Sequence, residues 1–181
     1  MRLFIAVKLS ETIENALLTA QDALRMHQIT GNYTECKNLH LTLAFIGEQD
    51  APSQVLNALK PLLFEPFSLS LSGKAGEFGE IWWAGVKYNP ELMALASKVR
   101  KALAENRIFF DRKPFRPHIT LLRKAKIPFG KVFDIRQLKL AGASMIVDRI
   151  SLMHSHRENG KLVYTELDYI QAQNGRRKND V

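Results

Sequence analysis

Cysteine is nearly absent from this chain of 181 residues, and Cys36 is its single example. One thiol excludes an intramolecular disulfide and a cysteine-rich zinc site, which fits a reducing compartment. Long hydrophobic runs are also missing. The apolar stretch at residues 3–7 ends at Lys8 and is too short for a signal-peptide core or a membrane span. We therefore expect a cytoplasmic protein with no membrane partner.

Acidic residues are scarce relative to basic ones, with 18 Asp and Glu against 26 Lys and Arg and a net charge of +8. This bias favours a polyanionic partner, with nucleic acid first and acidic lipid second. A basic surface that serves only solubility is the alternative, and charge alone leaves both open. The apolar fraction of 46% is ordinary for a globular protein, and the length suits one domain or two small lobes.

Two similar tetrads, 78 residues apart, are the most informative feature that the chain does contain. Residues 40–43 read His-Leu-Thr-Leu, and residues 118–121 read His-Ile-Thr-Leu. Each tetrad belongs to an apolar, alternating run, at residues 39–46 and 118–122, which predicts a β-strand. Their spacing is close to half of the chain, which indicates a duplicated unit.

The alternation of a strand places histidine and threonine of each tetrad on one face. His40 and Thr42 therefore project together, as do His118 and Thr120, while the apolar residues between them point to the other face. Packing of the apolar face does not require a histidine and a threonine on the opposite face, and yet both strands have them there. Two such strands facing each other would put two imidazoles and two hydroxyls around one small polar cavity.

The rest of the chain alternates helices and strands. Cap and breaker residues predict helices that begin after Ser10, at Pro52 and after Asn89, the first ending near Gly31 and the second near residue 62. Alternation predicts further strands at residues 2–7, 67–71, 81–86, 146–155 and 162–169. A glycine-rich turn is expected at residues 73–79, a basic loop at 107–117, and a hairpin turn at 158–160.

This order of elements predicts an α+β fold built as a bilobal duplicated unit, whose halves face each other across a cleft. Residues 1–172 are expected to form this single domain. Residues 173–181 are polar and basic, and we expect them to be a disordered tail.

Paired histidines suit acid–base chemistry at phosphorus. An imidazole titrates near neutrality, so one can accept a proton from an attacking water while the other donates a proton to the leaving alkoxide. Threonine hydroxyls can donate to the phosphate oxygens. Each histidine could instead be an ordinary strand residue, but the repeat in phase argues against this. Two histidines are too few for a zinc site, and the chain has no HExxH motif, so we expect no metal and no cofactor.

The tetrads and their flanks resemble the 2H phosphoesterase superfamily, and more narrowly the RNA 2′,3′-cyclic phosphodiesterases, historically called 2′-5′ RNA ligases. The resemblance covers residues 2–7, 38–48 and 117–123, with Ser155 and the stretch 160–164. It implies two antiparallel sheets around a central cleft, with helices packed outside. It also implies metal-independent opening of an RNA 2′,3′-cyclic phosphate to a 2′-phosphate, and reversible 2′-5′ ligation without ATP.

The resemblance also implies roles for the site residues. His40 would be the proton donor to the 3′-oxygen, and His118 the proton acceptor from water. Thr42 and Thr120 would hold the phosphate oxygens. Arg123 matches an arginine at the end of the second motif and is a candidate phosphate ligand. Its phase in the strand is that of the apolar residues, however, so a solvated strand-end charge is the alternative.

Other candidates are weaker. Phe45 could stack on a base, but its phase favours packing in the core. The basic loop at residues 112–116 leads into His118 and could guide RNA. The expected partner is RNA with 2′,3′-cyclic phosphate ends, such as tRNA fragments, bound by a monomer. The alternatives are a phosphodiesterase for small cyclic nucleotides and a non-catalytic RNA-binding module.

Overall fold

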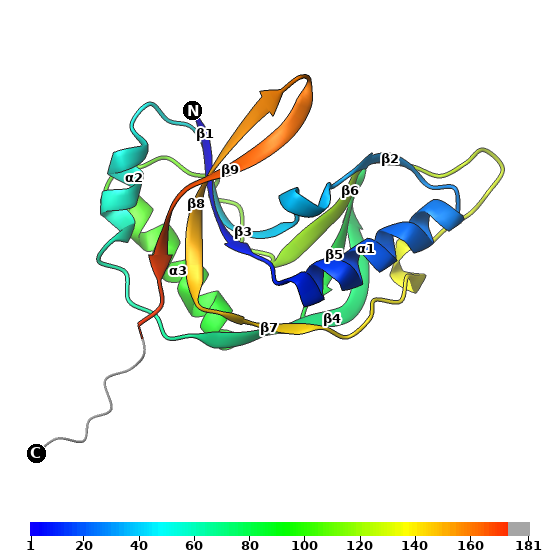
Figure 1. Cartoon of the computed structure of the whole chain (residues 1–181), viewed down its shortest axis with the longest axis horizontal. Helices are drawn as coiled ribbons and strands as arrows, with labels where there is room; N and C mark the ends of the chain where they lie inside the picture. The colour runs from blue at the N-terminus through cyan, green and yellow to red at the C-terminus, as the bar shows by residue number, and fades with distance from the viewer. Residues whose placement is uncertain (174–181) are drawn as a thin grey trace, which may run out of the picture.

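The computed structural model describes residues 1–173 and has the α+β fold expected from the sequence (Figure 1). Its α-helices are α1 (Glu11–Met26), α2 (Pro52–Leu59) and α3 (Pro90–Glu105), with short 3₁₀ helices η1 (Cys36–Asn38) and η2 (Ile135–Gln137). Its strands are β1 (Arg2–Lys8), β2 (Thr30–Tyr33), β3 (His40–Glu48), β4 (Phe67–Phe78), β5 (Ile81–Val86), β6 (His118–Lys126), β7 (Ser144–Val147), β8 (Arg149–Glu158) and β9 (Lys161–Gln171).

The strands form a curled antiparallel sheet in the order β7-β4-β5-β6-β3-β1-β8-β9, and β2 pairs with β6. One lobe contains β1, β3, β8 and β9, and the other contains β2, β4, β5, β6 and β7. The two lobes meet where β3 and β6 pair through Leu41 and Ile119. The two tetrad strands are therefore neighbours at the centre of the molecule, and each lobe contributes one of them.

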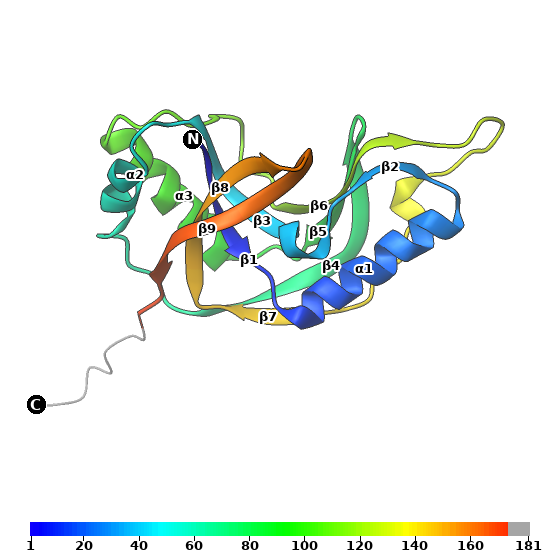
Figure 2. The same ribbon diagram turned by 45° about the horizontal axis from the view of Figure 1, so that its top comes forward.

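The helices pack outside the sheet, as expected. Figures 1 and 2 show α1 at one end of the molecule and α2 and α3 at the other. α1 contacts β6 and β7, whereas α3 contacts α2 and β3. The predicted helix starts are confirmed, because the Ser10 side chain accepts a hydrogen bond from the amide of Ile13, and that of Asn89 accepts one from Leu92. Each capping oxygen satisfies one of the free amides of the first helical turn.

The apolar residues of both tetrads lie in the core, which confirms the predicted faces of the two strands. Leu41, Leu43, Ile119 and Leu121 are each at most 1% exposed. The histidines and threonines between them are half-buried on the opposite face. The core thus fixes which side of each strand is left for polar chemistry.

Strand β2 differs from the sequence prediction, in which Gly31 ends the first helical segment. Gly31 has φ +144, and a Cβ atom there would lie 2.7 Å from the Lys124 carbonyl oxygen. Its missing side chain therefore allows β2 to approach β6 closely. This pairing extends the second lobe along the edge of the cleft.

Three other boundaries differ from the prediction. β4 continues through the expected glycine-rich turn, because a register shift between Leu71 and Ala75 absorbs Gly73, which has φ +75. The strand expected at residues 146–155 is two strands, since β7 pairs with β4 whereas β8 pairs with β1 and β9. The second helix ends at Leu59, three residues before the predicted limit.

Within the described part of the chain, none of the helices is both long enough and apolar enough to cross a lipid bilayer. Of the tail predicted at residues 173–181, positions 174–181 lie outside the described residues.

Candidate active site

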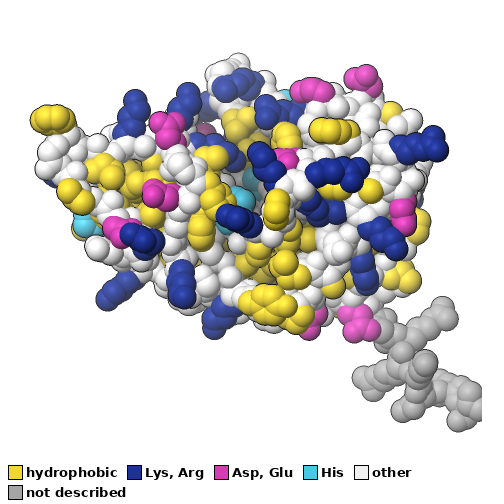
Figure 3. Space-filling model, turned by 180° about the vertical axis from the view of Figure 1, so that it is seen from behind, with side chains coloured by type: hydrophobic (Ala, Val, Ile, Leu, Met, Phe, Trp, Pro, Cys, Tyr) yellow, Lys and Arg dark blue, Asp and Glu magenta, His cyan; other side chains and the backbone are white. Residues whose placement is uncertain are grey.

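The antiparallel pairing of β3 with β6 places the histidine of each tetrad opposite the threonine of the other. With Leu41 opposite Ile119, the next residues align His40 with Thr120 and Thr42 with His118. The cleft accordingly holds two cavities. His40 and Thr120 line one of about 410 Å³, and Thr42 and His118 line another of about 570 Å³. Figure 3 shows a hollow in one face of the molecule, with histidine inside it and lysine and arginine side chains around it.

Both imidazoles are oriented by the same backbone contact. The Nδ1 atom of His40 lies 2.7 Å from the carbonyl oxygen of Asn38, and that of His118 lies 2.7 Å from the carbonyl oxygen of Arg116. A carbonyl can only accept, so Nδ1 carries the proton in each neutral ring. The Nε2 atom is thus the one that gains and loses a proton. In His40 it lies 3.0 Å from the Thr42 hydroxyl, which donates to it.

The surroundings of the two histidines are unequal. The His40 ring lies 4.8 Å from the Phe4 ring and 5.1 Å from the Tyr164 ring, and it is the more deeply buried. The pKa of His40 is lowered from its ordinary 6.5 to about 4, mainly by burial and to a smaller extent by the positive charge of Arg123. Burial, with the same arginine, also lowers the pKa of His118. The unliganded site therefore favours neutral imidazoles, and more strongly so at His40.

A β-bulge places Arg123 on the cleft face. Trp83 is opposite Thr120, whereas Trp82 is opposite Leu122, so Leu121 is an extra residue in β6. Leu121 and Leu122 are both buried, and the alternation resumes one residue later. Arg123 is consequently exposed and lines the cavity of His40 and Thr120. In a regularly alternating strand Arg123 would share the face of Ile119 and Leu121, and the bulge turns it to the opposite face.

The same bulge recurs in β3. Ala6 is opposite Thr42 and Ile5 is opposite Ala44, which makes Leu43 the extra residue. Phe45 then faces the larger cavity and is 36% exposed, so the prediction that it packs in the core is wrong. Phe45 and Arg123 are equivalent positions of the two tetrad strands. The two tetrad strands thus place the Phe45 ring at the larger cavity and the Arg123 guanidinium at the smaller one.

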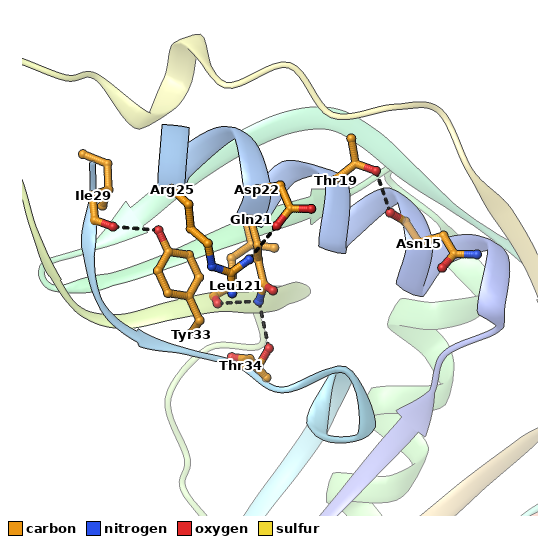
Figure 4. A network of polar contacts seen from close by, with 9 residues as sticks. All are labelled: Asn15, Thr19, Gln21, Asp22, Arg25, Ile29, Tyr33, Thr34 and Leu121. Atoms are coloured by element: carbon orange, nitrogen blue, oxygen red, sulfur yellow. Dashed lines mark hydrogen bonds and ion pairs between the residues drawn. The ribbon is translucent and has the colours of Figure 1, made fainter. Parts of the chain in front are cut away.

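A buried glutamine supports the bulge in β6 (Figure 4). The Gln21 side chain of α1 donates from Nε2 to the carbonyl oxygens of Leu121, at 2.9 Å, and Thr34, at 2.8 Å. The Thr34 amide also donates to the Leu121 carbonyl, at 2.9 Å. These contacts satisfy the carbonyl of the bulged residue in the protein interior, where a free carbonyl would be costly.

Asn38 and Tyr164 belong to the site, although local sequence pattern assigned neither a role. The buried Asn38 side chain donates to the Leu162 carbonyl at 2.9 Å and accepts from the Tyr164 amide at 3.2 Å. It thereby joins β9 to the residues before β3. Tyr164 stands edge-on to His40 as a result. These contacts join residues more than 120 positions apart, which leaves no signal in spacing or periodicity.

The basic loop before β6 borders the larger cavity, where Lys113 and Arg116 are lining residues. The Lys113 ammonium also lies 3.6 Å from the Asp111 carboxylate. Residues 1–173 contain no cluster of three or more His, Cys, Asp or Glu side chains that could hold a metal ion.

The chain matches known proteins along most of its length. The model of the 2′-5′ RNA ligase superfamily matches residues 13–159. An RNA 2′,3′-cyclic phosphodiesterase of Escherichia coli is 36% identical over 129 residues, which is 68% of this chain and 72% of that protein. One of Thermus thermophilus is 32% identical and covers 93% of this chain and 88% of its own length.

Comparison with solved structures leads to the same family. The crystal structure of E. coli LigT complexed with 3′-AMP superposes with a TM-score of 0.79 at 28% identity, covering 96% of this chain and 98% of that one. The shared fold agrees with the resemblance to 2H phosphoesterases that the tetrads carry. This chain belongs to the 2′-5′ RNA ligase superfamily.

Proposed function

We propose that this protein is an RNA 2′,3′-cyclic phosphodiesterase that opens the cyclic phosphate at an RNA 3′ end to a 2′-phosphate. The observation that carries the proposal is the crossed arrangement of the tetrads. Two imidazoles, each with Nδ1 bound to a backbone carbonyl, share one cleft with two threonine hydroxyls. Relatives that carry this name support the substrate class.

In the proposed reaction, water attacks phosphorus and the bond from phosphorus to the 3′-oxygen breaks. Nε2 of His118 accepts the proton of the water, and Nε2 of His40 donates a proton to the 3′-oxygen. The products are a 2′-phosphomonoester and a free 3′-hydroxyl. Thr42, Thr120 and the Arg123 guanidinium stabilise the negative charge on the phosphate oxygens.

The role of His40 as the acid requires that the substrate raise its pKa, because burial keeps the free imidazole neutral. The anionic phosphate supplies this effect, since a nearby negative charge favours the protonated ring. The division of roles itself follows the family resemblance. If a ribose 5′-hydroxyl replaces water as the nucleophile, the same bond to the 3′-oxygen breaks, the histidines keep these roles and a 2′-5′ bond forms. The histidines exchange roles when that bond is cleaved, because the 3′-hydroxyl then attacks phosphorus and the 5′-oxygen leaves.

The test of the reaction is incubation of the protein with an oligonucleotide that ends in a 2′,3′-cyclic phosphate, in buffer containing EDTA. The expected product is a 2′-phosphate, formed by the wild type and lost in His40→Ala and in His118→Ala. His27→Ala, at the end of α1, is the control and should retain activity. Turnover that survives both active-site changes, or that EDTA abolishes, would refute the mechanism.

The roles of the two histidines can be tested with a substrate in which sulfur replaces the 3′-oxygen. A thiolate leaves without protonation, so it removes the need for a general acid. His40→Ala should then recover most of its lost rate, whereas His118→Ala should not. Recovery in His118→Ala instead would reverse the assignment.

We further infer a monomeric, cytoplasmic enzyme whose domain spans residues 1–172 and which acts on RNA ends such as those of tRNA fragments. The basic composition supports an RNA substrate. A single species of monomer mass in light scattering, with and without RNA, is the expected result. A stable dimer would contradict this part of the proposal.

A further inference from the structure

The cavity on the His40 side extends well beyond the reacting groups. It runs from His40 and Thr120 between two walls. One wall is residues 32–35, at the end of β2 and just after it, and the other is the tip of the β8–β9 hairpin. Its volume of about 410 Å³ falls within the range of small-ligand sites. The site therefore has room for more of a substrate than the cyclic phosphate.

Positive charge converges on this cavity from both lobes. Arg123 comes from β6, and Arg157 and Lys161 come from the hairpin tip. Within residues 1–173, none of these three side chains forms an ion pair. The one carboxylate in the lining, on Glu35, lies 3.5 Å from the Lys37 ammonium. Among the described residues, no acidic side chain is paired with these cations, so the cavity keeps an excess of positive charge.

The hairpin tip holds its cations in a defined place. The Arg157 Nη1 atom donates to the Gly160 carbonyl at 2.7 Å across the turn. Asn38 fixes the adjacent part of β9 through its contacts with Leu162 and Tyr164. Arg157 is therefore held over the same cavity that His40 lines, and Lys161 lines it beside Arg157, so an extended anion could contact both cations while it reacts.

We propose that this cavity binds the phosphodiester backbone of the RNA strand on the 5′ side of the reacting end. The proposal rests on the function proposed above. The other cavity also has cations in its lining, which are Arg100, Lys113 and Arg116, but Lys113 is paired with Asp111. The rings of Phe45, Phe78 and Phe115 form much of its wall and suit the stacking of a base. The cationic cavity suits phosphates, which carry one charge per nucleotide and are recognised without regard to sequence. The enzyme then prefers oligonucleotides to single cyclic nucleotides.

The test compares 2′,3′-cyclic phosphates of one, two and four nucleotides. The variant Arg157→Gln/Lys161→Gln removes two exposed charges without touching the core. The matched control Lys60→Gln/Lys101→Gln removes two charges from the surface of the helical layer. For the wild type, KM should fall as the chain lengthens. In the hairpin variant KM for the tetranucleotide should rise about tenfold, as for two exposed ion pairs, with the mononucleotide unchanged.

Salt dependence gives a second measure. Each phosphate contact on a single strand contributes a slope of about −0.7 to log K against log salt concentration, so the hairpin variant should lose about 1.4. The control variant should lose none. An equal effect on one and four nucleotides, or an unchanged slope, would overturn the proposal.

A ligation assay distinguishes two RNA strands that could occupy the cavity, which are the strand that carries the cyclic phosphate and the 5′-hydroxyl strand that would be joined to it. If the hairpin variant weakens only the joining of an added 5′-hydroxyl RNA, the cavity holds the acceptor, and the assignment to the 5′-side strand is wrong. If the wild type opens no cyclic phosphate, the function proposed above fails. Fluorescence anisotropy with a 3′-phosphorylated tetranucleotide still tests the cavity, since the hairpin variant alone should bind about tenfold more weakly.

Discussion

The protonation of His40 offers a quantitative test of the active-site geometry. The ring is enclosed by Phe4 and Tyr164, and burial lowers its pKa from 6.5 to about 4. At pH 7 roughly one molecule in a thousand of the free protein would carry a charged His40. A general acid must be protonated when it acts, so the substrate has to reverse most of this effect.

The size of the reversal follows from the position of the phosphate. A single negative charge about 4 Å from Nε2, at an effective dielectric constant of about 20, stabilises the imidazolium by about 4 kcal/mol. This energy raises the pKa by about 3, which brings His40 back to about 7 in the complex. Burial thus keeps the His40 imidazole unprotonated and uncharged until a phosphate binds beside it.

Proton–carbon NMR of the five histidine rings measures both states. The His40→Gln variant identifies the resonance of His40. We expect a pKa near 4 in the free protein and a rise of at least two with a saturating nucleoside 2′-monophosphate, the product class. A free pKa near 6.5, or a rise of less than one with the product bound, would refute the reasoning.

Three further predictions test other parts of the structure. The pKa of His40 is lower in the folded protein than in the unfolded chain, so the free energy of unfolding should fall by about 3 kcal/mol as pH falls from about 6.5 to 4. Urea titrations at a series of pH values measure this decrease, and the His40→Gln variant should not show it. Gln21→Leu removes two hydrogen bonds, including one to Leu121, and should lower the free energy of unfolding by about 2–3 kcal/mol; an unchanged value would contradict the role of Gln21. Phe45→Ala should raise KM for cyclic phosphates about tenfold through lost stacking, and Phe45→Tyr should restore it; equal kinetics of the two variants would return Phe45 to a packing role.

Much of this protein follows from local sequence. The alternation of the tetrads predicts strands with His40 and Thr42 on one face, because side chains of a strand alternate regardless of the fold around them. Ser10 and Asn89 mark helix starts because capping depends on a single turn. The repeat predicts two lobes and a shared cleft, and the order of elements gives the α+β class.

The β-bulges in β3 and β6 do not follow from local sequence alone. The last residue of each tetrad begins one pair of consecutive apolar residues, Leu43-Ala44 in the first and Leu121-Leu122 in the second, and these pairs break the alternation. That signal was present, but its meaning depends on the neighbouring strands that leave one residue unpaired. Regular alternation therefore misplaced Phe45 and obscured Arg123.

Residue type and strand period are local properties, so the chain's own pattern is enough to identify which side chains could do the chemistry. How these side chains act together depends on the tertiary structure. It crossed His40 with Thr120, surrounded His40 with Phe4 and Tyr164, and brought Arg157 to the cavity from the far end of the chain. Distance in space, burial and the resulting pKa depend on which strands pair, and no repeat or spacing encodes that pairing.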